Sequence, residues 1–242
     1  MNKPRLMRCR PAAGVVLAVA LLQGCEPFDS SPMEPGEDAL VLLVPAMSVP
    51  ADGRTITVVK AQVPEDTKPA DRAVTFQTTL GALGPGTETQ MTVTAVDGSA
   101  TAQLRAPSAP GVAYVRATRG SVVRLDSVIF VRALAETVLV EPSKFALPAG
   151  AGSEMNVTAV LRRGTGTPTP GAAVQFVAFD EAGAQVGQFG LASLSDAEGR
   201  VQVRYTPGAT AYRGPVRIVA STPGPGGTIA GSAVVQVTSP PS

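Results

Sequence analysis

The sequence predicts an all-β chain that folds into two tandem β-sandwiches. Apolar residues alternate with polar ones at period two, as at Val59, Ala61 and Val63, which is typical of half-buried strands. Turn residues recur at intervals of about ten, and about seven such strands in about a hundred residues fit one antiparallel sandwich. The whole pattern then occurs a second time. Phe76 and Phe176, at equivalent positions of the two copies, are expected to lie in the two cores.

Each predicted strand of the first copy has a counterpart in the second. The first two, Val49–Ala51 and the strand from Val59 to Val63, recur 98 positions later. The next three recur after shifts of 100, 101 and 103 positions: Val74–Phe76 at Val174–Phe176, Gly98–Leu104 at Gly199–Tyr205, and Gly111–Ala117 at Gly214–Ala220. The shift grows only across Pro- and Gly-rich gaps, as insertions into loops between fixed strands would produce. We therefore place one domain at 39–133 and the other at 134–242.

One strand departs from simple alternation. Ile56 and Val58 are apolar but out of phase with Val59, Ala61 and Val63. A β-bulge adds one residue to a strand and so reverses the phase of its side chains. The sequence therefore predicts a bulge in this strand.

Residues 1–24 have the organisation of an export signal. Basic residues precede an apolar run, Ala12–Leu22, and no acidic residue occurs before Glu26. As a helix the run would be roughly 16 Å long, too short to cross a hydrocarbon core of about 30 Å. The sequence Leu22-Gln23-Gly24-Cys25 follows directly and resembles the lipobox of bacterial lipoprotein signal peptides.

This resemblance implies that Cys25 is lipidated and becomes the first residue of the mature chain. Cys9 leaves with the signal, so the mature chain would hold a single cysteine and no internal disulfide. A diacylglycerol thioether with an N-acyl chain such as palmitate would give a stable anchor. The membrane would then be contacted through the lipid on Cys25. The alternative is an ordinary signal peptide in which Cys25 is incidental.

Residues 25–38 are predicted to form a disordered tether. The segment has three prolines and no periodicity, and it carries acidic residues without any base: Glu26, Asp29, Glu34, Glu37 and Asp38. An extended chain of this length spans about 40 Å, and its like charges repel an anionic bilayer. Because the four basic residues of the signal are removed, the 20 Lys and Arg fall to 16 against 19 Asp and Glu, a net charge of −3.

Composition argues against an enzyme. The chain has no histidine, which removes the commonest general base and the commonest zinc ligand. With Cys25 lipidated, thiolate chemistry is excluded, and Lys60, Lys68 and Lys144 do not lie in a nucleophile motif such as S-x-x-K. We expect no catalytic residue, no cofactor and no metal. Neither half of the chain is strongly basic, so no nucleic-acid partner is expected.

The first copy resembles the bacterial Ig-like group 1 domain of invasin- and intimin-type adhesins. The residues that carry the resemblance are Val-Pro-Ala-Asp-Gly at 49–53, Val74-Thr75-Phe76, Leu80-Gly81-x-Leu83, the Asp97–Leu104 strand and Gly111–Ala117. The second copy is similar but divergent, since its Asp-Gly pair becomes Asp196-Ala197-Glu198-Gly199. The resemblance implies two tandem immunoglobulin-like β-sandwiches in a stalk or adhesion module outside the cytoplasm. It identifies no receptor-binding residue.

Two pairs of acidic residues are of the type that ligates calcium, Asp180-Glu181 and Asp196-x-Glu198. They lack the dense oxygen spacing of a dedicated calcium loop, so solvated turn residues are the preferred interpretation, and calcium at a domain edge is left open. The arginines of the second copy are balanced by acids and are interpreted as ordinary surface charge. Tyr114 and Tyr205 are expected in the core or at a sheet edge rather than stacked on a sugar.

Two functional classes fit these observations. The first is a non-catalytic, lipid-anchored cell-envelope protein, an Ig-like spacer and adhesion module that binds a protein partner. The second is an accessory lipoprotein that binds a carbohydrate or another envelope polymer. A row of exposed aromatic rings on one sheet would favour the second class, and the scarcity of aromatic residues favours the first. Glu26 follows Cys25 in place of the Asp that resembles an inner-membrane retention signal, so an outer-membrane location is expected.

Partner contact is expected in two loops that lie between the same two strands of each copy. Domains of this kind bind through end loops or sheet edges. The loops Pro64–Arg72 and Arg162–Gly171 differ most in charge. The candidate contact residues are Glu65, Asp66 and Lys68 in the first loop and Arg162 and Arg163 in the second.

Overall fold

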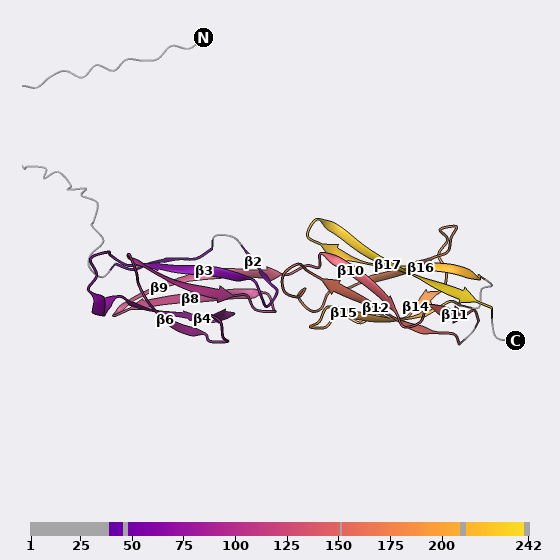
Figure 1. The fold of residues 1–242 in the computed structure, drawn as a ribbon, viewed down its shortest axis with the longest axis horizontal. Helices are drawn as coiled ribbons and strands as arrows, with labels where there is room; N and C mark the ends of the chain where they lie inside the picture. Colours follow the sequence, from indigo (N-terminus) through magenta and orange to yellow (C-terminus); the bar gives the residue numbers. More distant parts are fainter. Residues whose placement is uncertain (1–38, 46–47, 151, 209–211, 240–242) are drawn as a thin grey trace, which may run out of the picture. The chain divides into compact units, whose positions relative to one another are not determined.

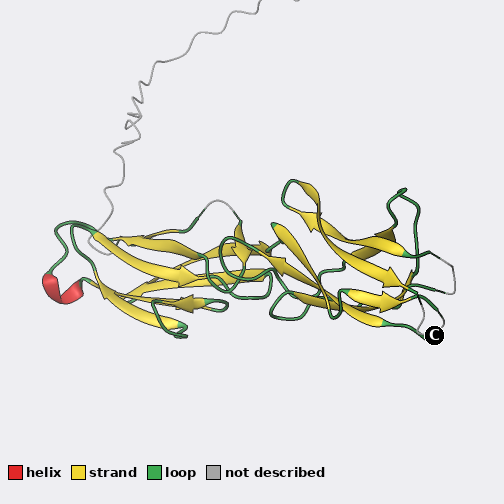
Figure 2. Cartoon of the chain, turned by 45° about the vertical axis from the view of Figure 1, so that its right-hand side comes forward, coloured by secondary structure: helices red, strands yellow, loops and turns green. Residues whose placement is uncertain are grey.

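The computed structural model describes residues 39–45, 48–150, 152–208 and 212–239. The export signal, Cys25 and the tether lie outside these residues. The regular elements of the described chain are β-strands, with no α-helix and a single 3-10 turn, η1 (Pro69–Asp71) (Figure 2). Among the helices of this described part, none has the length and apolar character needed to cross a membrane.

The first sandwich consists of two sheets. Its strands are β1 (Val41–Leu43), β2 (Val49–Ala51), β3 (Ile56–Gln62), β4 (Ala73–Thr78), β5 (Ala82–Leu83), β6 (Gln90–Thr94), β7 (Ser99–Arg105), β8 (Gly111–Arg119) and β9 (Val122–Arg132). One sheet has the order β1-β3-β7-β5 and the other β2-β9-β8-β4-β6 (Figure 1). Alternate residues of both sheets form a largely aliphatic core that also holds the buried rings of Phe76 and Phe130.

The second sandwich repeats this plan. Its strands are β10 (Thr137–Pro142), β11 (Ala146–Pro148), β12 (Met155–Arg162), β13 (Gln175–Phe179), β14 (Gln188–Phe189), β15 (Arg200–Thr206), β16 (Gly214–Gly224) and β17 (Gly227–Thr238). The sheets have the orders β10-β12-β15-β14 and β11-β17-β16-β13. A separate core lies between them. The all-β prediction and the prediction of sandwich architecture are both confirmed.

The strand pairing of the two sandwiches reproduces the repeat in the sequence. Leu42 of β1 pairs with Ala61 of β3, and Val140 of β10 pairs with Ala159 of β12, each residue 98 positions further on. In both sandwiches the short second strand also runs parallel to the last strand, through β2 beside β9 and β11 beside β17. The spacing of apolar residues in the sequence therefore gave the correct equivalence of strands.

The predicted bulge in β3 is wrong. β3 pairs with β7 without interruption, from Ile56 opposite Arg105 to Gln62 opposite Ser99. Ile56 and Val58 instead point away from the core and are exposed, while Val59 is buried on the opposite face. The strand thus carries apolar residues on both faces. This accounts for the break in alternation without a bulge.

The second core is closed by aromatic rings that are not equivalent to Phe76. Tyr205 is fully buried, as expected, and burial raises its pKa to about 12. Its ring centroid lies 5.0 Å from that of Phe189, which lies 5.7 Å from that of Phe176. Phe176 is only partly buried, so it lies at the margin of this core rather than at its centre.

Candidate functional site

The first predicted partner loop connects β3 to β4 at one end of the first sandwich. Thr67 organises it, because its Oγ1 donates to the Pro64 carbonyl at 2.6 Å and its own carbonyl accepts from Arg72 Nε at 2.8 Å. Arg119, at the end of β8, donates from Nη1 to Thr67 Oγ1 at 3.2 Å. The three predicted contact residues of this loop, Glu65, Asp66 and Lys68, are all exposed.

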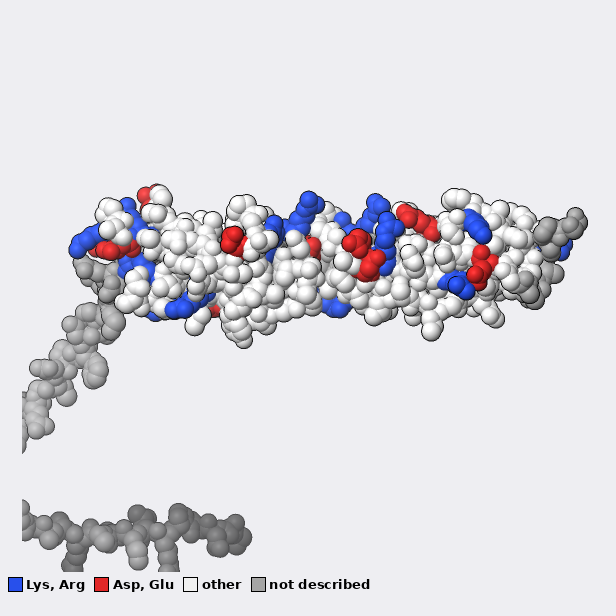
Figure 3. Space-filling model, turned by 90° about the horizontal axis from the view of Figure 1, so that it is seen from below, with Lys and Arg blue, Asp and Glu red and all other residues white. Residues whose placement is uncertain are grey.

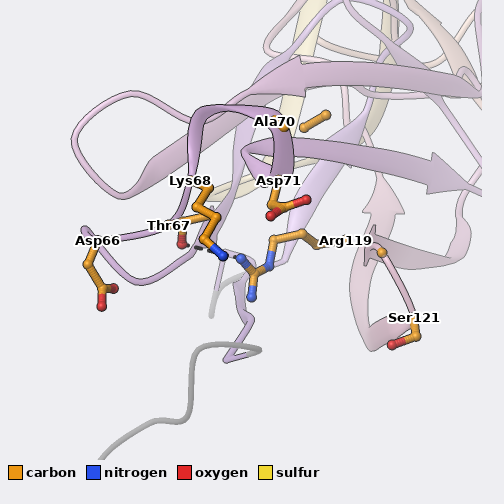
Figure 4. Close-up of a pocket in the computed structure, with 9 residues that line it drawn as sticks. Asp66, Thr67, Lys68, Ala70, Asp71, Arg119 and Ser121 are labelled. Atoms are coloured by element: carbon orange, nitrogen blue, oxygen red, sulfur yellow. Dashed lines mark hydrogen bonds between the residues drawn. The ribbon is translucent and has the colours of Figure 1, made fainter.

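A cavity of about 320 Å³ lies between this loop and the turn that joins β8 to β9. Its lining includes Lys68, Asp66 and Asp71 from the loop side and Arg119 and Ser121 from the turn side. Figure 4 shows the side chains of Lys68 and Arg119 directed toward each other, whereas Asp66 points away. The structure thus brings two of the predicted contact residues to one cavity, together with Arg119, which the sequence did not single out.

In the second predicted loop, Arg163 and Gly164 contact the segment that enters the second sandwich. Arg163 donates from Nη1 to the Leu134 carbonyl at 2.5 Å, and its Nη2 lies 3.6 Å from a carboxylate oxygen of Glu136. The same carboxylate accepts from the Gly164 N–H at 2.9 Å. Arg163 is therefore used within the chain rather than presented to a partner. Arg162, at the end of β12, is exposed.

Thr169 connects this loop to both the linker and the first sandwich. Its Oγ1 accepts from the Ala133 N–H at 2.8 Å and donates to the Ala51 carbonyl at 3.0 Å, and its N–H donates to the Ala133 carbonyl at 2.9 Å. Thr169 is itself buried. Because these bonds join backbone groups of the linker and of β2, they set where the loop lies against the first sandwich.

Asp52 also contributes to the contact between the β12–β13 loop and the first sandwich. The Asp52 carbonyl accepts from the Thr167 N–H at 3.1 Å, and Gly166 packs directly on Asp52. Gly166 has a φ of +67°, and a Cβ there would lie 2.8 Å from both Cβ and Cγ of Asp52. Only glycine fits such a position without displacing its neighbour. Sequence analysis missed this contact because no local pattern relates two positions so far apart in the chain.

Asp52 is 2 % exposed, and both oxygens of its carboxylate accept hydrogen bonds. Its Oδ1 accepts from the N–H groups of Arg54 at 2.9 Å and Thr55 at 2.6 Å, and its Oδ2 accepts from Thr55 Oγ1 at 2.6 Å. Burial raises the pKa of this carboxyl, but the hydrogen bonds from Thr55 and Arg54 and the charge of Arg163 outweigh that effect. The net pKa lies below the ordinary value of 3.8.

Tyr114 is neither in the core nor at a sheet edge, contrary to the sequence-based expectation. It lies on β8, inside its sheet, and is 59 % exposed. Four of the outward residues around it on β8 and β9 are also large and apolar, whereas Arg116 and Ser127 are polar, and we define the apolar stripe as Val112, Tyr114, Leu125, Ile129 and Val131. Val112 pairs with Ile129, and Tyr114, which lies opposite Ser127, is diagonal to Ile129 and Leu125, so the apolar side chains follow one another along the two strands.

A shallow cavity of about 330 Å³ lies beside the apolar stripe. It is lined by Tyr114, Leu125 and Arg116 together with Gln77 and Gln90 of the neighbouring strands. The sequence carried a signal for this surface, because Gly111–Ala117 has apolar residues at successive as well as alternate positions. Such a run indicates a strand with two apolar faces.

Comparison with known proteins gives likeness of structure only. No family model and no curated protein matches the chain. Invasin, described as a bacterial integrin-binding protein, is 21 % identical with a TM-score of 0.61, over 84 % of this chain and 40 % of its own. The adhesin InvE of Yersinia pseudotuberculosis is 17 % identical with a TM-score of 0.48, over 82 % of this chain and 58 % of its own.

The sandwiches have the Ig-like fold of invasin. This confirms the fold that the resemblance implied. The chain spans less than half of the invasin chain that it matches.

The acidic pairs of the second Ig-like sandwich serve its turns. Asp180 Oδ1 accepts from the Ala184 N–H at 2.8 Å, and Asp196 Oδ1 accepts from the N–H groups of Glu198 and Arg200 at 3.1 and 2.7 Å. No group of three potential metal ligands occurs among the residues that the structure describes. These contacts agree with the interpretation of both pairs as turn residues.

The charged residues of the Ig-like sandwiches do not form a basic surface. Arg204 lies 3.1 Å from Glu154 and Arg200 lies 3.8 Å from Glu141, measured between nitrogen and carboxylate oxygen. Figure 3 shows Lys and Arg interspersed with Asp and Glu over the face that it draws. The arrangement fits ordinary surface charge rather than recognition of an anionic polymer.

Proposed function

We propose that this chain is a non-catalytic, lipid-anchored cell-envelope protein whose Ig-like sandwiches act as a spacer and adhesion module and bind a protein partner. The fold shared with invasin, itself described as integrin-binding, supports this class. The observation that carries the proposal is the apolar stripe on β8 and β9, because a contiguous exposed apolar surface marks a site of interaction.

The composition of the apolar stripe supports a protein as the occupant. Tyr114 supplies a ring and a hydroxyl, Arg116 lies beside it, and tyrosine and arginine are the residue types enriched at the centres of protein interfaces. The adjacent strands supply a polar rim. Thr75 and Thr92 bond to each other at 2.9 Å and Gln77 Nε2 donates to Gln90 Oε1 at 2.8 Å, so one hydrogen bond of each pair persists when water is displaced.

The loop Pro64–Arg72 is proposed as a second contact. Its side chains Glu65, Asp66 and Lys68 are exposed and belong to the same sandwich as the apolar stripe. Arg162 is proposed with them. Arg163 is no longer proposed, because Glu136 and the Leu134 carbonyl already hold its guanidinium.

The alternative function, binding of a carbohydrate or another envelope polymer, has less support. We take a row of exposed aromatic rings on one sheet as the feature that would favour it. In the described ranges, the large aromatic side chains with high exposure are Tyr114 and Phe145, and they belong to different sandwiches. They do not form a row.

The double variant Tyr114→Ser/Leu125→Ser should bind the partner at least about tenfold more weakly, since it removes two central apolar contacts. The matched control is Phe145→Ser/Val234→Ser, which removes comparably exposed apolar residues from the second sandwich. A partner captured from envelope and host-surface extracts by the soluble mature chain is identified by mass spectrometry, purified and titrated against all three proteins. Equal affinities for parent and double variant would contradict the proposal.

The same capture distinguishes the two functional classes. Binding that disappears when the extract is treated with protease supports a protein partner. Binding that survives protease but is lost after periodate oxidation of glycans would support the polymer-binding alternative instead.

The Cys25→Ser variant tests the proposed lipid anchor. Without a thiol at this position no thioether can form, so the variant should move from the detergent phase to the aqueous phase of a Triton X-114 partition. Equal partition of parent and variant would contradict anchoring at Cys25. Membrane fractionation of the parent then tests the proposed outer-membrane location.

A further inference from the structure

The second sandwich shows how an entering segment of chain is held. Ala133 exchanges two hydrogen bonds with Thr169 of the β12–β13 loop, and Glu136 accepts from Gly164 and pairs with Arg163. The β16–β17 hairpin contacts the segment from its other side. The entering segment Ala133–Glu136 therefore lies between a loop and a hairpin end.

The hairpin contact is close. A Cβ at Gly224, the last residue of β16, would lie only 3.1 Å from the Ala135 carbonyl oxygen. Thr222 and Pro223 of the same strand line a cavity of about 260 Å³ together with residues 132–135.

The first sandwich has the same two elements with a larger cavity between them. Loop Pro64–Arg72 corresponds to the β12–β13 loop, and the β8–β9 hairpin corresponds to β16–β17. The β8–β9 pairing ends at Arg119 opposite Val122, whereas β16–β17 pairing runs on to Gly224 opposite Gly227. The shorter hairpin leaves the cavity of about 320 Å³ that Figure 4 shows.

Strand register identifies the segment that should lie there. β1 and β3 pair in the same register as β10 and β12, with both strands displaced by 98 positions. The same displacement makes Pro35–Asp38 the counterpart of Ala133–Glu136.

We propose that Pro35–Asp38 docks in the cavity between the β3–β4 loop and the β8–β9 turn, with Asp38 in the place that Glu136 has in the second sandwich. The segment is joined directly to Ala39, the first described residue of the first sandwich, so its docking costs less chain entropy than binding of a free peptide.

Charge complementarity favours this occupant. Glu37 and Asp38 are acidic, and the whole segment 25–38 contains no base. In the second sandwich Arg163 pairs with Glu136, but the equivalent position in the first sandwich is Glu65, which is acidic. Positive charge is supplied there by Lys68 and Arg119, from the two sides of the cavity. Asp66 and Asp71 also line the cavity; Asp66 points away from Lys68 and Arg119, whereas Asp71 lies beside Arg119 (Figure 4), so the docked carboxylates are expected next to Lys68.

Docking would shorten the free tether to residues 26–34. This consequence rests on the proposed lipid anchor, since only an anchored chain has a tether. The docking itself requires neither lipid nor partner.

Disulfide cross-linking in the mature chain from residue 25 tests the docking. The Cys25→Ser background has no other cysteine. Glu37→Cys/Ser121→Cys places one thiol on the segment and one on the cavity lining. Glu37→Cys/Asp97→Cys is the control, because Asp97 lies in the β6–β7 turn beside the β3–β4 loop but outside the cavity lining. The Ser121 pair should oxidise about tenfold faster than the Asp97 pair. Equal rates would overturn the proposal.

A charge exchange adds a second criterion. Asp38→Lys should slow oxidation of the Ser121 pair about fivefold, and the further change Lys68→Asp should restore the rate. A rate unaffected by Asp38→Lys would also overturn the proposal. Because these measurements involve soluble protein alone, their failure is distinct from failure of the proposed adhesion or anchoring.

Discussion

Replacing Phe76 with alanine should lower the free energy of unfolding of the first sandwich by about 3–5 kcal/mol, because the ring leaves a cavity that a rigid core fills only in part. Phe76 is 0 % exposed on β4, an internal strand of its sheet. Urea unfolding of the soluble mature chain, followed by far-UV circular dichroism, measures the cost. If the two sandwiches unfold in separate transitions, the transition that shifts in Phe76→Ala is the one that belongs to the first sandwich.

Phe176→Ala is the matched comparison. The two phenylalanines are equivalent in sequence, but Phe176 is only partly buried and packs beside Phe189 at the margin of the second core. Its loss should therefore cost clearly less than the loss of Phe76. Equal costs would show that position in the repeat, rather than burial, determines the contribution of the ring.

The Asp52→Ala variant should destabilise the first sandwich and loosen its contact with the β12–β13 loop. The change removes the acceptor for the Arg54 and Thr55 N–H groups, whose hydrogen bonds to Asp52 are partly buried, and we expect a total cost of about 1–3 kcal/mol. Asp196→Ala is the control, because that carboxylate makes a similar turn but is exposed, so water replaces it. Thermal unfolding of the three proteins gives the comparison, and equal losses would contradict the role assigned to Asp52.

The same variant predicts a change in acid stability. The folded pKa of Asp52 lies below its unfolded value of 3.8, so its stabilising contribution is complete above pH 3.8 and is lost as the pH falls through the folded pKa. Asp52→Ala should lose less stability than the parent protein between pH 4 and the folded pKa of Asp52. Parallel pH profiles of the two proteins would show that the carboxylate does not titrate as described.

Much of the fold could be predicted because the repeat constrains it. The alternation at Val59, Ala61 and Val63 gave the buried face of β3, and the shift of 98 positions gave β12. Side-chain period alone does not distinguish a strand with one apolar face from a strand with two. The period therefore predicts a bulge at Ile56 and places Tyr114 in the core or at a sheet edge, although both side chains are exposed on internal strands of their sheets.

The candidate site was harder to predict than the strands. Glu65, Asp66 and Lys68 lie at the end of the sandwich as expected, because end loops follow from strand order. The position of Arg163 depends on Glu136 and Leu134, which lie between β9 and β10. These contacts join a loop to a segment outside the strands, and a single sequence contains no period that reports them.

The parallel pairing of β2 with β9 determines how the first sandwich would respond to tension. Val49 lies opposite Phe130 and Ala51 opposite Arg132. A force that draws the entry and exit of this sandwich apart pulls β2 and β9 lengthwise in opposite directions. The hydrogen bonds between them are then loaded together and must break together, instead of opening one after another. The lifetime under load is set by the unfolding rate, and breaking these hydrogen bonds together slows unfolding under such a force, which suits the proposed spacer and adhesion module.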